Sequence, residues 1–122
     1  MGIIISITKM NKPKIQIIIG STRQNRSGEL VAKYVKNIAS NKTDLEFELI
    51  DLRDWKLPFY DEVAGPMGLK GNYSSAIGKK WAAKVAEADG YIFITPEYNH
   101  GYSAVLKNAL DYAYFEWNRK PV

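Results

Sequence analysis

The sequence predicts an α/β protein with a doubly wound parallel sheet, in which helices cover both faces of the strands. Two features favour this fold. Residues 15–19 and 91–95 are short apolar runs, which are typical of strands buried on both faces. Each run leads into a polar loop and then into a helical pattern, and right-handed crossovers join such units into one parallel sheet. We therefore expect the spatial strand order 2-1-3.

The first half of the chain predicts a strand–loop–helix unit followed by an edge strand. Residues 14–20 form the first strand, and residues 28–39 form a helix because apolar side chains recur there at helical spacing with lysines between them. These apolar residues are Leu30, Val31, Tyr34, Val35 and Ile38. Residues 45–49 alternate between polar and apolar side chains, as in a strand with one wetter face. We therefore place this second strand at an edge of the sheet.

The second half repeats the pattern after a long irregular segment. Residues 53–75 show no period and contain several prolines and glycines, so we expect a loop with a role in binding or assembly. Residues 75–88 return to helical spacing, residues 91–95 form the third strand, and residues 103–114 form the last helix. The apolar stripe of the helix before the third strand consists of Ile77, Trp81, Val85 and Ala88.

Length, charge and composition narrow the classes of function. The 122 residues suffice for one domain, which we place at residues 14–122, after an amino-terminal extension of residues 1–13 that is too short for a membrane span. The net charge of +4 is mild and dispersed, so we expect a small anionic ligand and neither nucleic acid nor a membrane as partner. The absence of cysteine excludes disulfides, thiolate metal sites and a cysteine nucleophile, and it fits a cytoplasmic setting.

The loop after the first strand has the composition of a phosphate-binding site. It reads Gly20-Ser21-Thr22-Arg23-Gln24-Asn25-Arg26-Ser27-Gly28. A strand-to-helix loop supplies backbone N–H groups and the positive end of a helix, while hydroxyls and arginines add donors and charge. The loop matches neither the NTPase P-loop nor the dinucleotide-binding glycine pattern, so a mononucleotide phosphate fits better. The alternative is an ordinary turn whose polar residues serve backbone geometry.

The loop after the third strand has the composition of a platform for a flat ring. It reads Pro96-Glu97-Tyr98-Asn99-His100-Gly101-Tyr102, and it lies at the carboxyl end of a strand, where α/β proteins bind ligands. The helix that follows begins near Ser103, a favourable N-cap residue. The alternative is that the tyrosines and His100 are surface residues. A site is favoured because both loops open at one switch point, between the first and third strands.

Several motifs together resemble one family. They are Gly20-Ser21-Thr22-Arg23 with Arg26 and Gly28, Asp51-Leu52, Leu57-Pro58-Phe59-Tyr60-Asp61, residues 96–111, Glu116-Trp117 and Lys120-Pro121-Val122. Residues 14–122 resemble the NAD(P)H-dependent FMN reductases of flavodoxin-like fold, whose members reduce flavins, quinones, azo compounds or chromate.

The resemblance implies an FMN-containing oxidoreductase that passes a hydride from NADPH or NADH through the flavin to a small-molecule electron acceptor. The first loop would hold the FMN phosphate and the second loop the isoalloxazine ring. The implied cofactor-binding residues are Ser21, Arg23, Arg26, Ser27, Gly28, Pro96, Glu97, Tyr98, Asn99 and Gly101. No catalytic side chain is implied, because the cofactor carries the reaction. The resemblance also implies a homodimer or homotetramer, with aromatic surface from Trp81, Tyr114, Phe115 and Trp117.

The chain departs from the family in two ways. Ser103 stands where many members have proline. Residues 120–122 look like the start of a fourth strand, and we expect strands 4 and 5 to be missing, which leaves the third strand with an open edge. Two alternatives stay open: a flavodoxin-type FMN electron carrier, which the basic charge disfavours, and an inactive truncated remnant. A receiver domain and a low-molecular-weight tyrosine phosphatase are disfavoured because their acidic residues and cysteine are missing.

Overall fold

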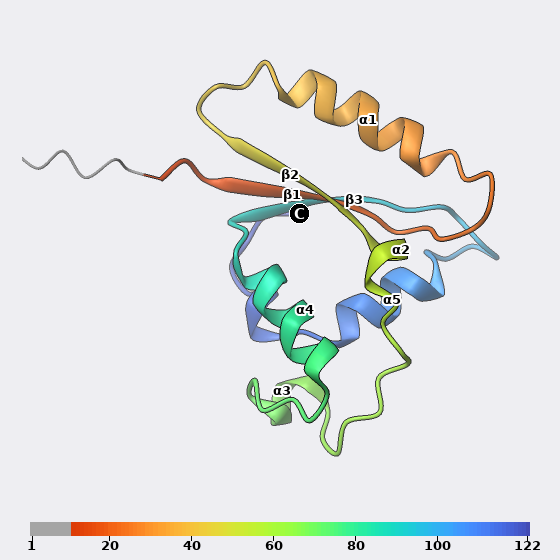
Figure 1. The fold of residues 1–122 in the computed structure, drawn as a ribbon, viewed down its shortest axis with the longest axis vertical. Coiled ribbons are helices and arrows are strands. Elements are labelled where there is room, and N and C mark those ends of the chain that lie inside the picture. The colour runs from red at the N-terminus through yellow and green to blue at the C-terminus, as the bar shows by residue number, and fades with distance from the viewer. Residues whose placement is uncertain (1–10) are drawn as a thin grey trace, which may run out of the picture.

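The computed structural model describes residues 11–122 and has a three-stranded parallel sheet with helices on both faces (Figure 1). In chain order the elements are β1 (Lys14–Ile19), α1 (Gly28–Ala39), β2 (Glu46–Asp51), α2 (Leu52–Trp55), α3 (Pro66–Leu69), α4 (Ala76–Ala86), β3 (Gly90–Ile94), α5 (Ala104–Asp111) and a 3-10 helix (Phe115–Trp117). The strand order β2-β1-β3 confirms the predicted topology. The expected extension lies outside the described residues, except for residues 11–13.

The central strand β1 has one hydrophobic cluster on each of its faces. Ile17 and Ile19 pack with Ala32 on the side of α1, whereas Ile18 belongs to a larger cluster with Trp81 and other residues of α4 and α5. The three isoleucines are at most 1% exposed. Figure 1 shows α1 on one side of the sheet and α4 and α5 on the other. The alternation of side chains along a strand therefore accounts for the two layers.

Several element boundaries differ from the prediction. The segment predicted as an irregular loop contains two one-turn helices, α2 and α3, and the Asp51 side chain starts α2 by accepting a hydrogen bond from the backbone N–H of Arg53. The strand β3 begins at Gly90, one residue earlier than predicted. The helix α5 ends at Asp111 because the chain then turns back, so that Trp117 packs edge-on against Tyr91 with ring centroids 4.7 Å apart.

Exposure of some side chains also differs from the prediction. The apolar stripe of α1 is only partly covered, since Leu30 is 69% and Tyr34 is 66% exposed. Trp81 is fully buried and donates from Nε1 to the carbonyl oxygen of Ala109 at 2.8 Å, so the expectation that it adds aromatic surface is wrong. Tyr114 and Phe115 are about half exposed, as expected. The Nζ of Lys84 on α4 lies 3.0 Å from a carboxylate oxygen of Glu48 on β2.

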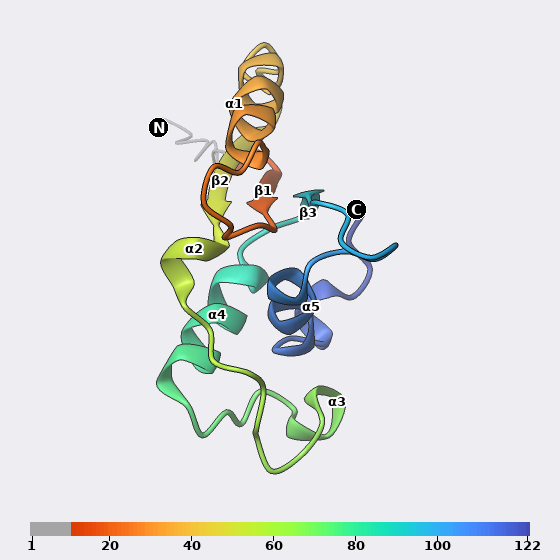
Figure 2. The ribbon, with the colours of Figure 1, turned by 90° about the vertical axis from the view of Figure 1, so that its right-hand side faces the viewer.

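The last residues of the chain lie beside the outer edge of β3 (Figure 2). The backbone N–H of Tyr91 donates to the carbonyl oxygen of Pro121 at 3.0 Å. A Cβ atom at Gly90 would lie 3.1 Å from Cγ of Pro121, so this close approach favours glycine. No strand is formed by residues 120–122, but they cover part of an edge that the sequence predicted to be open. Among the helices of residues 11–122, none is long and apolar enough to cross a membrane.

Candidate functional site

The loops after β1 and β3 are joined at their bases. The backbone N–H of Gly20 donates to the carbonyl oxygen of Ile94 at 2.7 Å, and the hydroxyl of Ser103 donates to the carbonyl oxygen of Gly20. A Cβ atom at Gly20 would lie 3.2 Å from the carbonyl oxygen of Ile94 and from Cδ2 of Leu106. The close approach of two chain segments therefore favours glycine here.

The first loop and the base of the second loop line one cavity of about 440 Å³. All five residues predicted to bind phosphate line it, but only two of the residues predicted to lie along a ring do. The lining residues are Ser21, Arg23, Arg26, Ser27, Gly28, Val31, Val35, Ile92, Phe93, Ile94, Thr95, Pro96 and Tyr98. The structure thus brings the two predicted groups together at one edge of the sheet, over an apolar floor supplied by α1 and β3.

The second loop is a tight hairpin turn. Tyr98 and Gly101 exchange two backbone hydrogen bonds, of 2.8 and 3.0 Å, and the two residues between them, Asn99 and His100, have φ of 51° and 64°. Positive φ at both central positions is the pattern of a type I′ turn, whose backbone is rigid. Glu97 and Gly101 line a separate shallow hollow, and Asn99 lines neither space.

Arg26 is held by the protein itself. Its Nη1 donates to the carbonyl oxygen of Ser21 at 2.5 Å and to Oδ1 of Asp51 at 2.8 Å, and its Nη2 donates to Oδ2 of Asp51. Its side chain is 4% exposed. The hydrogen bond with Asp51 raises the pKa of Arg26, and the same contact lowers the pKa of Asp51. The Nη groups therefore act within the loop and are not free to bind a ligand.

Arg23 has a different environment. Its side chain is exposed and makes one hydrogen bond among the described residues, from Nη1 to the carbonyl oxygen of Gln24 at 3.1 Å. Its own carbonyl oxygen accepts a hydrogen bond of 3.0 Å from Nη2 of Arg53. Neither Asp51 nor Arg53 was predicted as a site residue from the sequence. The only indication in the sequence was that Asp51-Leu52 is one of the motifs shared with the resembled family. That resemblance marks the position but assigns no role to either residue.

Several donors of the first loop have no acceptor within residues 11–122. The hydroxyl of Ser27 makes no capping bond to α1, and the backbone N–H groups of Gly28 and Glu29 have no partner. Nε of Arg26 is buried and also lacks a partner. A Cβ atom at Gly28 would lie 3.1 Å from Oγ of Ser21, so the close packing of the loop favours glycine. Unpaired donors at the positive end of a helix suit an anion.

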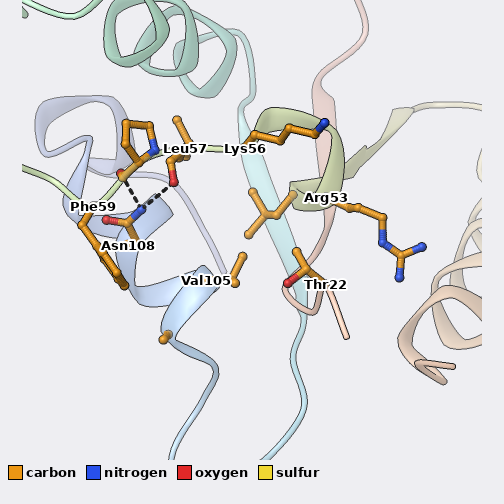
Figure 3. A pocket seen from close by; sticks show the side chains of 10 residues that line it. Thr22, Arg53, Lys56, Leu57, Phe59, Val105 and Asn108 are labelled. Atoms are coloured by element: carbon orange, nitrogen blue, oxygen red, sulfur yellow. Dashed lines mark hydrogen bonds between the residues drawn. The ribbon is translucent and has the colours of Figure 1, made fainter. Parts of the chain in front are cut away.

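A second cavity, of about 470 Å³, lies on the other side of the first loop (Figure 3). It shares no lining residue with the first cavity. Its lining residues are Thr22, Leu52, Arg53, Lys56, Leu57, Pro58, Phe59, Ala104, Val105 and Asn108. Nδ2 of Asn108 donates to the carbonyl oxygens of Leu57 and Pro58 at 3.3 and 2.9 Å, as the dashed lines in Figure 3 show. The side chain of Asn108, which lies on α5, thereby anchors residues 57 and 58, which form the opposite wall of the cavity.

Comparison with known proteins identifies the family. The sequence profile described as NADPH-dependent FMN reductase matches residues 13–122. The chain belongs to this family. It is 44% identical over 110 residues to an NAD(P)H-dependent FMN reductase of Schizosaccharomyces pombe, an alignment that covers 90% of this chain and 55% of the relative. It is 30% identical over 109 residues to a 2-hydroxy-1,4-benzoquinone reductase of a Burkholderia species, covering 87% and 52% of the two chains.

A solved structure agrees with this family assignment. FerB of Paracoccus denitrificans, a flavoenzyme NAD(P)H:(acceptor) oxidoreductase, is similar with a TM-score of 0.67 and 26% identity, covering 89% of this chain and 57% of FerB. The flavodoxin-like architecture predicted from the sequence is therefore confirmed over the described elements. The chain spans about half the length of the curated relatives that it matches.

Proposed function

We propose that this chain forms an FMN site in an NAD(P)H-dependent oxidoreductase that passes a hydride to a small quinone. The observation that supports this function most is the shared cavity, in which the hydroxyl- and arginine-bearing loop after β1 meets the base of the hairpin after β3. A phosphate group and a flat ring, joined in one ligand, match these two neighbouring surfaces. The family of the chain supplies the identity of that ligand.

The first loop fits the phosphate of FMN. Its unpaired donors are the hydroxyl of Ser27 and the first N–H groups of α1, and the exposed guanidinium of Arg23 adds a charge that can move onto the phosphate. Ser21 lines the same cavity, and its Oγ lies against Gly28. Arg26 contributes by holding the loop, because both of its Nη groups are occupied by Ser21 and Asp51.

The second loop fits one face of the isoalloxazine ring. Pro96 and Tyr98 line the cavity, and the hairpin turn fixes the backbone beside them. We assign Glu97, Asn99 and Gly101 to the same platform, with Gly101 pairing to Tyr98 through the backbone. Rigid backbone beside a ring limits the number of ways in which the ring can tilt, and this orients the flavin toward its co-substrate.

Bound FMN would supply the redox chemistry, by accepting a hydride from NADPH or NADH and giving it to the acceptor. The protein side chains then bind and orient, and none has to act as an acid or a base. His100 and Glu97 are 99% and 76% exposed in their side chains, which suits surface residues better than buried proton donors. We assign the acceptor to the quinone class from the Burkholderia relative. A homo-oligomer in the cytoplasm remains part of this proposal.

The test is to add FMN to the purified chain and to measure bound flavin and NADPH oxidation with and without 2-hydroxy-1,4-benzoquinone. The proposal predicts retained flavin and NADPH oxidation that depends on the quinone. A flavodoxin-type carrier would retain FMN without turning over NADPH with the quinone, and an inactive remnant would retain none. Either of those results would contradict the proposed function.

A further inference from the structure

Two arginines, one within the first loop and one in α2, bind backbone carbonyl groups of that loop. Arg26 donates to the carbonyl oxygen of Ser21 at 2.5 Å, and Arg53 donates to the carbonyl oxygen of Arg23 at 3.0 Å. Two alternate carbonyl groups of one short loop are thus bound by guanidinium groups, one from the end of the same loop and one from α2. The loop therefore has more support than its own turn geometry supplies.

One carboxylate binds the guanidinium of Arg26 and the backbone of Arg53. Oδ1 of Asp51 accepts from Nη1 of Arg26 at 2.8 Å and from the backbone N–H of Arg53 at 3.0 Å, and Oδ2 accepts from Nη2 of Arg26. The side chain of Asp51 is 21% exposed and that of Arg26 is 4% exposed. A forked pair shielded in this way is more rigid than a single surface contact. Asp51 therefore joins the end of β2 to the loop after β1.

The hydrogen bonds from Arg26 and Arg53 determine the orientation of the peptide groups in the first loop. In a trans peptide the carbonyl of one residue and the N–H of the next point to opposite sides. Because the arginines bind the carbonyl groups of Ser21 and Arg23, the N–H groups of Thr22 and Gln24 point away from the arginines. Neither N–H has an acceptor within residues 11–122. The orientation of these free donors depends on Arg26 and Arg53, and so on Asp51.

We propose that Asp51 is a positioning residue that gives the first loop its preference for a phosphate-bearing flavin, acting through Arg26 and Arg53 without touching the ligand. This inference rests on the proposed function, because it concerns the same site. Asp51 is acidic and lies beside the proposed phosphate site, where a negative charge by itself opposes the binding of an anion. Positioning and through-space charge therefore predict opposite effects when the carboxylate is neutralised.

The experiment compares the affinity for FMN with that for riboflavin in the wild-type chain and in Asp51→Asn. The variant keeps the shape of the side chain but removes its charge and one acceptor for the guanidinium. If Asp51 positions the loop, the FMN-to-riboflavin affinity ratio falls about tenfold, as expected for the loss of a hydrogen bond to a charged group. An unchanged or higher ratio overturns the inference. Equal losses for both ligands also overturn it, because they indicate general damage to the fold.

A matched control is Asp89→Asn. Asp89 also accepts a backbone hydrogen bond, from the N–H of Lys14 at 2.8 Å, but it lies at the opposite end of the sheet. This variant should leave the affinity ratio as in the wild type. A fall equal to that of Asp51→Asn would overturn the inference, since the effect would then follow from the loss of any capping carboxylate.

Hydrogen exchange separates this inference from the proposed function. If the wild-type chain takes up neither FMN nor riboflavin, the proposed function fails. The effect of Asp51 on the rigidity of the first loop can still be measured without flavin. Asp51→Asn should speed exchange of the two amides that donate to the carbonyl oxygen of Ser27, those of Leu30 and Val31, about tenfold, whereas Asp89→Asn should not. Unchanged exchange in these residues overturns the inference.

A charge-preserving variant, Arg53→Lys, serves if Asp51→Asn does not fold. It keeps the positive charge beside the loop and removes the forked donor to the carbonyl oxygen of Arg23. The inference predicts a lower FMN-to-riboflavin affinity ratio and faster exchange of the amides of Leu30 and Val31. Wild-type values for both measurements would overturn it.

Discussion

The hydroxyl of Ser103 joins the two loops of the site, because it donates to the carbonyl oxygen of Gly20 while it accepts from the backbone N–H of Leu106 at 3.1 Å. One buried side chain thus caps α5 and satisfies a carbonyl group of the first loop. The N-cap role predicted from the sequence is confirmed. The contact with Gly20 could not be predicted, because it depends on how the strands pair.

Replacing Ser103 with alanine should destabilise the chain. The change removes a cap and leaves a buried carbonyl group without its partner, so the free energy of unfolding should fall by about 1–3 kcal/mol. Urea unfolding at neutral pH measures this loss. Ser40→Ala is the control, because the hydroxyl of Ser40 makes only an exposed hydrogen bond to the carbonyl oxygen of Asn37. Equal midpoints for the two variants would show that the contact between the loops contributes nothing.

Replacing Asn108 with alanine should loosen the segment after α2. The Asn108 side chain accepts from the backbone N–H of Tyr60 at 3.1 Å and donates to two carbonyl oxygens of the same segment. We expect the free energy of unfolding to fall by about 1–3 kcal/mol and proteolysis within residues 57–64 to become faster. Asn37→Ala, on the exposed face of α1, is the control. Proteolysis at the wild-type rate would contradict the role of Asn108 as a clamp.

Two buried tyrosines should make the chain sensitive to alkali. Burial raises the pKa of Tyr73 and of Tyr91 to about 12, from an ordinary value of 10.0. The folded state then holds these protons more tightly than the unfolded state, so stability is at its full value below pH 10 and falls as the pH rises toward 12.

Thermal unfolding at a series of pH values between neutral and strongly alkaline measures this loss. Tyr91→Phe should reduce the slope of Tm against pH in the alkaline range, because one of the tyrosine protons that the folded state holds more tightly is gone. The variant also loses the hydrogen bond of 2.8 Å from the Tyr91 hydroxyl to the carbonyl oxygen of Val85, so its Tm at neutral pH should be lower. An unchanged alkaline slope would contradict the burial of this hydroxyl.

His100→Gly should preserve or raise the stability of the chain. His100 has φ of 64° in the hairpin turn, a conformation that is unfavourable for a side chain with Cβ and free for glycine. The change also gives the turn an Asn-Gly sequence, which is preferred at these positions. Flavin binding should be unchanged if His100 serves only the backbone. A large loss of flavin or of NADPH oxidation would indicate a role for the imidazole.

The elements with strong local signals were predictable from the sequence, and the exceptions have physical reasons. The helix α1 has the predicted bounds, and the strand order follows from the two apolar runs and right-handed crossovers. The helices α2 and α3 were missed because a single turn is too short to show a period. The last helix was predicted three residues too long, because its pattern continues into residues that turn back onto Tyr91.

The meeting of the two loops at one cavity was predicted from the sequence, whereas the contacts of the individual loop residues were not. Loop placement after two buried strands correctly brought Ser21 and Tyr98 to one cavity. The different environments of Arg23 and Arg26 could not be predicted, since Arg26 is occupied by a carboxylate that lies 25 residues further along the chain. Whether an arginine faces a ligand or its own protein depends on such distant contacts. The same reason explains why the role of Asp51 was missed.

The most direct test of the proposed FMN site is the affinity of Arg23→Ala for FMN and for riboflavin, measured by equilibrium dialysis beside the wild type. Arg23 is the exposed arginine of the first loop, and a charge-assisted bond to phosphate contributes about 1.5–3 kcal/mol that riboflavin cannot receive. Lys36→Ala removes an exposed charge from α1 as the control. The account predicts that Arg23→Ala binds FMN at least about tenfold more weakly, with riboflavin binding unchanged. Equal weakening of both ligands, or a wild-type chain that does not prefer FMN, would contradict it.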